Sequence, residues 1–308
     1  MSAGLAIAAL SLFGCDSGPE GPTPGRPTFD GDLAMELVHR QVDFGPRVPG
    51  TEGHADQLMW MLARLDSLAP VVQADTFTHV TSSAADTLTL TNVLARFNPD
   101  ASRRILLLAH WDTRPTSDAE PDVTMRTQPV PGANDGASGT AVLLTLAGLM
   151  SDVPPPPSLG VDILLVDGED FGPGVEDMLL GARRYAETVP DDDRPVFGLL
   201  LDMVGDADPR FPVEGYSAQA ANVVVQKVWR AAERLGYRSY FPTAVGQTLT
   251  DDHVPLIQAG IATANLIDFT YGPDNAYWHT GQDLPDKVSA STLGMVGEVV
   301  AELVYSGG

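Results

Sequence analysis

The chain has 308 residues, of which 44% are hydrophobic and 19% are charged, so it is long enough to bury the core of one large domain. Its formal net charge of −23 argues against nucleic acid as a partner, because phosphate backbones bind basic side chains. The single cysteine excludes an intrachain disulfide.

The N-terminus has the pattern of an export signal. Leu5 to Phe13 are mostly apolar and too few to span a bilayer as a helix. Cys15 and a Gly- and Pro-rich stretch from Ser17 to Pro27 follow. This order resembles a bacterial lipoprotein signal peptide, so we expect export to the periplasm or cell surface, with a lipid on Cys15 as the only membrane contact. No Lys or Arg precedes the apolar stretch, which leaves an ordinary secretory signal or an incidental cysteine as alternatives.

The remaining sequence predicts alternating helices and strands. In chain order we expect helices at 30–44 and 52–68, strands at 71–80, 88–97 and 103–109, a helix at 138–150, a strand at 161–166, a helix at 175–188, a strand at 196–203, helices at 217–235 and 251–259, a strand at 261–267, and a helix at 289–305. This alternation indicates an α/β sandwich with a largely parallel sheet and an antiparallel pair at one edge. We assign residues 1–29 to a signal and flexible tether, and residues 30–308 to a single domain.

Two adjacent acids, Glu169 and Asp170, come just after the apolar strand at 161–166. Open α/β sheets build their sites at the carboxyl ends of the strands. Neighbouring carboxylates are costly unless a cation is close or one of them takes up a proton. A metal ion with a general base beside it would satisfy both acids.

Other residues that could bind a metal also follow predicted strands or open the next helix. They are His110 and Asp112, Asp135 in a Gly-rich turn, Asp202, and His279 in the loop before the last helix. Each alone is ordinary, since a strand often ends in a turn-forming Asp. Together, at the edge of one parallel sheet, they suit zinc without any cysteine. Two ions roughly 3.5–4 Å apart, bridged by one carboxylate, would use the whole set.

The order of these residues resembles the zinc-dependent aminopeptidase and glutaminyl-peptide cyclotransferase superfamily. The resemblance covers nearly the whole chain after residue 30, and the segment from Asp43 to His54 is similar to the N-terminal signature of the family. It implies a zinc exopeptidase-like fold, which is a three-layer α/β/α sandwich with a central mixed, mostly parallel sheet. It also implies one or two zinc ions as cofactor and the N-termini of peptides or proteins as substrate.

The resemblance assigns a role to each site residue. The implied zinc ligands are His110 with Asp170 at one ion, Asp202 with His279 at a second, and Asp135 as the bridge. Glu169 would be the catalytic general base or acid, and Asp112 would orient His110. The family often has Glu where this chain has Asp170, which is one methylene shorter, so a shifted ion or unequal affinity at the two positions is left open.

Two late segments favour the cyclase branch of the superfamily. Asp251-Asp252-His253 begins a match to the Asp-Asp-His-Ile-Pro motif of that branch, and Trp278 stands where many aminopeptidases have Tyr. On this match Asp252, rather than Asp251, would join a hydrogen-bonded acid network as a catalytic residue. Trp278, Asp251 and His253 would line the substrate site. The structural alternatives are a helix N-cap for the acid pair and core packing for Trp278.

The implied function is therefore a zinc-dependent glutaminyl-peptide cyclotransferase. A zinc aminopeptidase is the alternative, because both branches share the metal ligands. A non-catalytic, lipid-anchored binding protein on the same scaffold is a third and more remote possibility.

Overall fold

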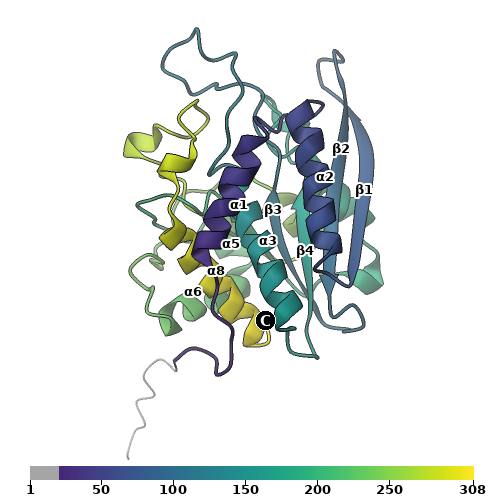
Figure 1. The fold of residues 1–308 in the computed structure, drawn as a ribbon, viewed down its shortest axis with the longest axis vertical. Coiled ribbons are helices and arrows are strands. Elements are labelled where there is room, and N and C mark those ends of the chain that lie inside the picture. Colours follow the sequence, from purple (N-terminus) through teal and green to yellow (C-terminus); the bar gives the residue numbers. More distant parts are fainter. Residues whose placement is uncertain (1–20) are drawn as a thin grey trace, which may run out of the picture.

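The computed structural model describes residues 21–308, and Figure 1 shows their arrangement. The expected signal segment and Cys15 lie outside the described residues. Within residues 21–308, no helix has both the length and the apolar character needed to cross a membrane.

A six-stranded sheet forms the centre of the fold, in the order β1-β2-β4-β3-β5-β6. Its strands are β1 (Val71–Val80), β2 (Thr87–Phe97), β3 (Arg104–His110), β4 (Gly160–Val166), β5 (Gly198–Asp202) and β6 (Thr263–Ile267). The last four run parallel to one another, whereas β1 and β2 form an antiparallel edge. The predicted mixed, mostly parallel sheet with an antiparallel edge is confirmed.

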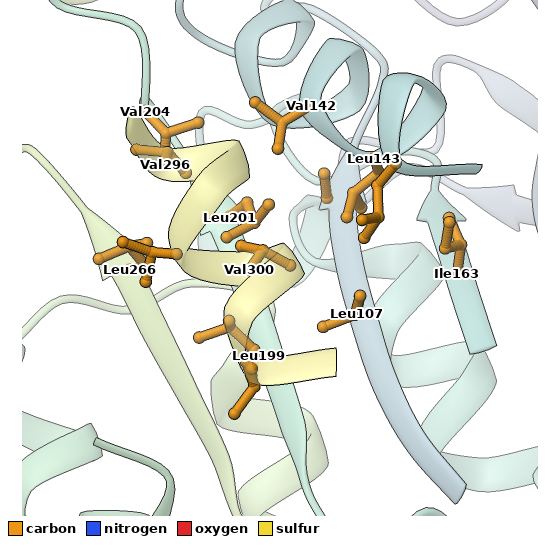
Figure 2. Packing of buried hydrophobic residues seen from close by; sticks show 14 of the residues in the cluster. Leu107, Val142, Leu143, Ile163, Leu199, Leu201, Val204, Leu266, Val296 and Val300 are labelled. Atoms are coloured by element: carbon orange, nitrogen blue, oxygen red, sulfur yellow. The ribbon is translucent and has the colours of Figure 1, made fainter. Parts of the chain in front are cut away.

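Helices cover both faces of the sheet. They are α1 (Gly31–Asp43), α2 (Glu52–Asp66), α3 (Ala137–Asp152), α4 (Leu180–Thr188), α5 (Gly215–Ala220), α6 (Asn222–Arg234), α7 (His253–Gln258) and α8 (Ala290–Tyr305). Side chains alternate between the faces along each strand. Leu107 joins the larger apolar cluster, which includes residues of α1, α3, α6 and α8. Leu108 joins a smaller cluster with Ala182 of α4 and Leu256 of α7. Figure 2 shows the larger cluster, with Leu107 and Leu201 facing α3 and α8.

Two predicted helices are each divided in two. The segment at 217–235 is α5 followed by α6, because α5 packs on β6 while α6 packs mainly on α8. The segment at 175–188 is a 3₁₀ turn, Val175–Asp177, followed by α4. Between them Leu179 has φ +58°, which an α-helix does not allow. The backbone N–H groups of Leu179 and Leu180 donate to the carbonyls of Glu169 and Gly168 instead, so this break secures the turn after β4.

The predicted flexible tether is packed against the domain where the structure describes it. The backbone N–H and the hydroxyl of Thr23 donate to the buried carboxylate of Glu302, at 3.0 and 2.9 Å. Arg26 pairs with the same carboxylate, and the ring of Phe29 is buried against Gly297 of α8. The buried carboxylate of Glu302 needs polar partners, and Thr23 and Arg26 supply them. The packed part of the chain therefore includes residues before residue 30.

Candidate active site

The first group of site residues forms where two parallel strands end. His110 is the last residue of β3 and Asp202 the last of β5, and these strands are neighbours in the sheet. Nε2 of His110 lies 3.3 Å from a carboxylate oxygen of Asp202 and 3.1 Å from one of Asp135. Asp135 approaches closely because Gly136 follows it at φ +93°, where an added Cβ would meet the carbonyl oxygen of Asp112 at 2.6 Å.

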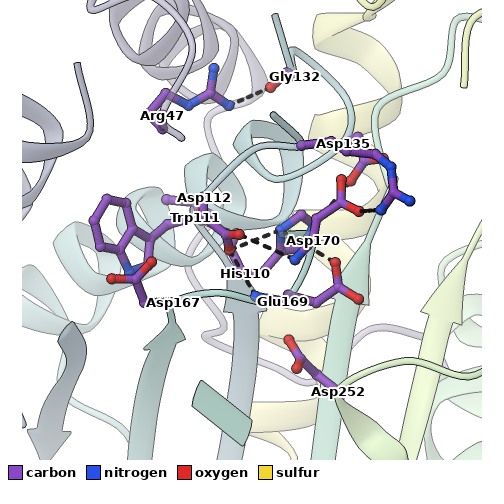
Figure 3. Close-up of polar contacts among 12 residues, drawn as sticks. Arg47, His110, Trp111, Asp112, Gly132, Asp135, Asp167, Glu169, Asp170 and Asp252 are labelled. Carbon is purple, nitrogen blue, oxygen red and sulfur yellow. Dashed lines mark hydrogen bonds and ion pairs between the residues drawn. The ribbon is translucent and has the colours of Figure 1, made fainter. Parts of the chain in front are cut away.

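A second group forms on the other side of Asp135. Nε2 of His279 lies 3.6 Å from the second oxygen of Asp135 and 3.5 Å from an oxygen of Asp170. The structure therefore contains two buried groups that could each hold a metal ion, and Asp135 belongs to both, as a bridging ligand must. Figure 3 shows Asp135 and Asp170 beside His110.

The implied pairing of the ligands is wrong. His110 groups with Asp202 rather than with Asp170, and Asp170 groups with His279. Sheet order explains the difference, because β3 and β5 are hydrogen-bonded neighbours and bring His110 and Asp202 together. Asp170 lies four residues beyond the end of β4, where the turn carries it toward the loop of His279.

The site buries an excess of negative charge. Seven of its buried carboxyl groups are Asp112, Asp135, Glu169, Asp170, Asp202, Asp251 and Asp252. Burial, reinforced by Asp135, raises the pKa of Asp170 to about 7 against the opposing effect of His279. A cation between these carboxylates would remove much of this cost, so the imidazole and carboxylate donors fit a zinc ion.

Glu169 lies next to both metal-capable groups without belonging to either. One of its carboxylate oxygens is 4.0 Å from Nδ1 of His110. Burial raises its pKa well above the ordinary value, and the charges of Asp170, Asp251 and Asp252 act in the same direction. A positioned carboxyl group with a raised pKa is a better proton acceptor than an ordinary glutamate, so Glu169 is suited to take up a proton and to return it.

Asp112 fixes the turn that carries Glu169. Its two oxygens accept hydrogen bonds from the backbone N–H groups of Glu169 and Asp170, both at 3.1 Å. It also faces Nδ1 of His110 at 3.6 Å, which suits an ion pair but is too long for a hydrogen bond. Asp112 thus acts on the acid pair directly, which the sequence did not predict.

The second acid pair is buried beside Glu169. Asp251 accepts a hydrogen bond of 2.6 Å from the side chain of Asn265, and burial with the charge of Asp202 raises its pKa to about 7. Asp252 occupies the N-cap position of α7, but its side chain makes no capping hydrogen bond. Both of its oxygens are buried without a hydrogen-bond partner among the described residues. Figure 3 shows this carboxyl group pointing toward Glu169.

Trp278 and His253 have different surroundings. The ring of Trp278 is partly buried and stacks on His279, with 3.8 Å between ring centroids. It also meets Phe269 edge-on, so it lies beside the second metal-capable group. The ring of His253 is fully buried and lies 3.0 Å from Glu214, which caps α5, and His253 belongs to neither metal-capable group.

Comparison with known proteins identifies the family. Residues 92–304 match Peptidase family M28. The chain belongs to peptidase family M28. A glutaminyl cyclase from Bacteroides thetaiotaomicron is 36% identical, with a TM-score of 0.87 over 92% of this chain and 100% of that one. A leucine aminopeptidase precursor from the same species is 35% identical, with a TM-score of 0.88 over 92% and 99%.

A curated relative agrees with this result. The glutaminyl-peptide cyclotransferase of Boiga dendrophila is 25% identical over 296 residues, which are 84% of this chain and 76% of the relative. The predicted superfamily is confirmed.

The N-terminal signature of this M28 chain, from Asp43 to His54, contacts the two turns that carry Asp135 and Glu169. The fully buried guanidinium of Arg47 donates to the carbonyls of Pro131 and Gly132, just before the turn of Asp135. Figure 3 shows the bond to Gly132. Burial lowers the pKa of Arg47 to about 10. His54 lies 2.9 Å from Asp167, which precedes Glu169 by two residues. The sequence singled out this segment but assigned no role to either residue.

Three further residues of this M28 site were not predicted. The carboxylate of Asp283 accepts the backbone N–H groups of Asn134 and Asp135, at 2.7 and 3.0 Å. Arg114 donates to Asp170 at 2.5 Å and to Asp118 at 2.8 Å.

Proposed function

We propose that this chain is a zinc-dependent glutaminyl-peptide cyclotransferase, which converts the N-terminal glutamine of a peptide or protein into pyroglutamate and releases ammonia. The observation that carries this proposal is the cluster of buried carboxyl groups formed by Glu169, Asp251 and Asp252, next to residues that could hold a metal. The similarity to a bacterial glutaminyl cyclase over 92% of the chain supports it.

We infer that the two groups around Asp135 hold one or two zinc ions. The donor set favours zinc, since it consists of imidazole and carboxylate groups in a buried site with excess negative charge. When bound, zinc supplies a Lewis acid that polarises the side-chain amide of the glutamine. Metal analysis of the purified protein measures the number of ions.

Cyclisation requires one proton to move between two nitrogen atoms. The α-amino nitrogen of the substrate forms a bond to the side-chain amide carbon, and the bond from that carbon to the amide nitrogen breaks. Glu169 takes the proton from the attacking amine and gives it to the leaving ammonia, so Glu169 ends as it began. Burial raises the pKa of Glu169, and the nearby charges of Asp251 and Asp252 raise it further, which favours the protonated form that Glu169 takes during the transfer.

A zinc aminopeptidase is the second candidate. His110, Asp135 and Asp202 form a complete group of their own, so the site offers ligands for two ions. The similarity to a leucine aminopeptidase precursor supports the same alternative. In that reaction Glu169 would take a proton from water rather than from the amine of the substrate.

One incubation separates these functions. Purified protein with zinc is given a peptide that begins with Gln and a matched peptide that begins with Leu. Ammonia release with loss of the free amine, and no free amino acid, supports the cyclotransferase. Release of free Leu without cyclisation refutes it and favours the aminopeptidase. Bound zinc without turnover of either peptide favours a non-catalytic binding protein.

We also propose export and a lipid anchor at Cys15, on the basis of the sequence pattern. Expression in a bacterium supplied with labelled fatty acid tests the anchor. The label should enter the wild-type protein and be lost in Cys15→Ser. An unlabelled wild-type protein in the soluble fraction would contradict the anchor.

A further inference from the structure

Arg114 and Asp118 form an ion pair that contacts Asp170 and His279 of the second metal-capable group. Nη1 of Arg114 donates to Asp170 at 2.5 Å, while Nε and Nη2 donate to one oxygen of Asp118 at 3.1 and 2.8 Å. The other oxygen of Asp118 lies 3.1 Å from Nδ1 of His279. Nε2 of His279 lies 3.5 Å from Asp170, which closes a ring of four side chains.

Asp118 contacts His279 at Nδ1, the ring nitrogen that faces away from the metal-capable group. Nε2 faces Asp135 and Asp170, so Nδ1 is the nitrogen available for a supporting bond. A carboxylate on the outer nitrogen of a metal-binding His fixes its tautomer and orientation and makes it a stronger ligand. His279 also has φ +53°, a backbone conformation that is costly for a residue with a side chain. Hydrogen bonds to the imidazole of His279 therefore help to offset the cost of this backbone conformation and to hold the imidazole in place.

Arg114 holds two carboxylates at once. A guanidinium presents its donors in a rigid planar fork, so one Arg can fix two acceptors in a defined geometry. Arg114 is only 5% exposed, and water does not compete for these bonds. The side chain of Asp118 is 42% exposed, so Asp118 depends on Arg114 to keep its oxygen aimed at His279.

We propose that Arg114 and Asp118 are positioning residues for the metal-binding half formed by Asp170 and His279. Asp118 orients the imidazole of His279, and Arg114 holds both Asp118 and Asp170 in place. This inference rests on the proposed zinc site, but it is independent of whether the reaction is cyclisation or hydrolysis.

Zinc affinity, measured by competition with a coloured chelator, tests the proposal without any activity assay. Asp118→Asn should weaken the binding of one zinc ion by about 10- to 100-fold, because the outer bond to His279 loses its charge. Asp122→Asn is the matched control, since Asp122 lies exposed on the same loop and caps only Thr124. Its zinc affinity should equal that of the wild type.

A double-mutant cycle tests the role of Arg114. Arg114→Met and Asp118→Asn should together weaken zinc binding by less than the product of their separate effects, because Asp118 is no longer aimed once Arg114 is gone. Fully independent effects would overturn the shared role. Unchanged zinc affinity in Asp118→Asn, with or without a lower unfolding temperature of the metal-free protein, would overturn the positioning role. A wild-type protein that binds no zinc would instead refute the proposed metal site itself.

Discussion

Replacing Glu169 by glutamine removes the proposed proton carrier while preserving the size of the side chain. General acid–base catalysis by a positioned carboxyl group is worth about 10²–10⁴-fold in rate, or about 3–5 kcal/mol in the activation free energy. We expect a loss in the upper part of this range, because Glu169 is buried and bulk water cannot readily replace it. Zinc should stay bound, because Glu169 belongs to neither metal-capable group.

The assay compares kcat/KM for the Gln-peptide and the zinc content of each purified variant. Glu176→Gln is the control, because Glu176 is an exposed glutamate in the 3₁₀ turn at Val175–Asp177. The stability of Glu169→Gln should equal or exceed that of the wild type, since one of seven crowded buried carboxyl groups becomes neutral. Full activity in Glu169→Gln, or loss of zinc together with activity, would refute the assigned role.

Three more predictions concern stability. Asp162→Asn should cost about 3–5 kcal/mol in urea unfolding, because it leaves the buried Arg104 without its ion-pair partner. Asp191→Asn, in an exposed pair, should cost less than about 0.5 kcal/mol, and equal losses would refute the argument. Zinc should raise the unfolding temperature of the metal-free protein, and no shift at saturating zinc would contradict a native metal site.

The last prediction is a pH dependence. Although burial acts in the opposite direction, the bond to His253 and three backbone N–H groups lower the pKa of Glu214 to about 2. The unfolded chain therefore binds this proton at higher pH than the folded chain, so the stabilisation is present above about pH 4.5 and is lost as the pH falls toward 2. Glu214→Gln should lack this part of the pH dependence, and parallel stability curves would contradict the assignment.

Much of the fold followed from patterns that are local in the sequence. Buried strands such as β3 and β4 are continuous apolar runs, and the parallel sheet follows from their alternation with helices. The divided helix around Leu179 could not be predicted, because its break depends on hydrogen bonds to the distant turn of Glu169. Tertiary contacts override helical propensity at such a point.

The sequence predicted which residues form the site but not which of them lie next to one another. Strand ends identified His110 and Asp202, and a Gly-rich turn identified Asp135, whereas their grouping depends on the order of strands in the sheet, which cannot be read from the sequence. Supporting residues such as Asp283 and Arg114 were missed for a similar reason. Their partners lie far away in the chain and meet them only after folding.

The most direct test of the central claim is the mass of a Gln-peptide after reaction in water labelled with heavy oxygen. Cyclisation uses no water, so the account predicts a peptide that has lost one ammonia and gained no heavy oxygen. Hydrolysis would instead shorten the peptide by its first residue and place heavy oxygen in the released amino acid. That second result, obtained with the zinc-loaded wild-type protein, would contradict the proposed function.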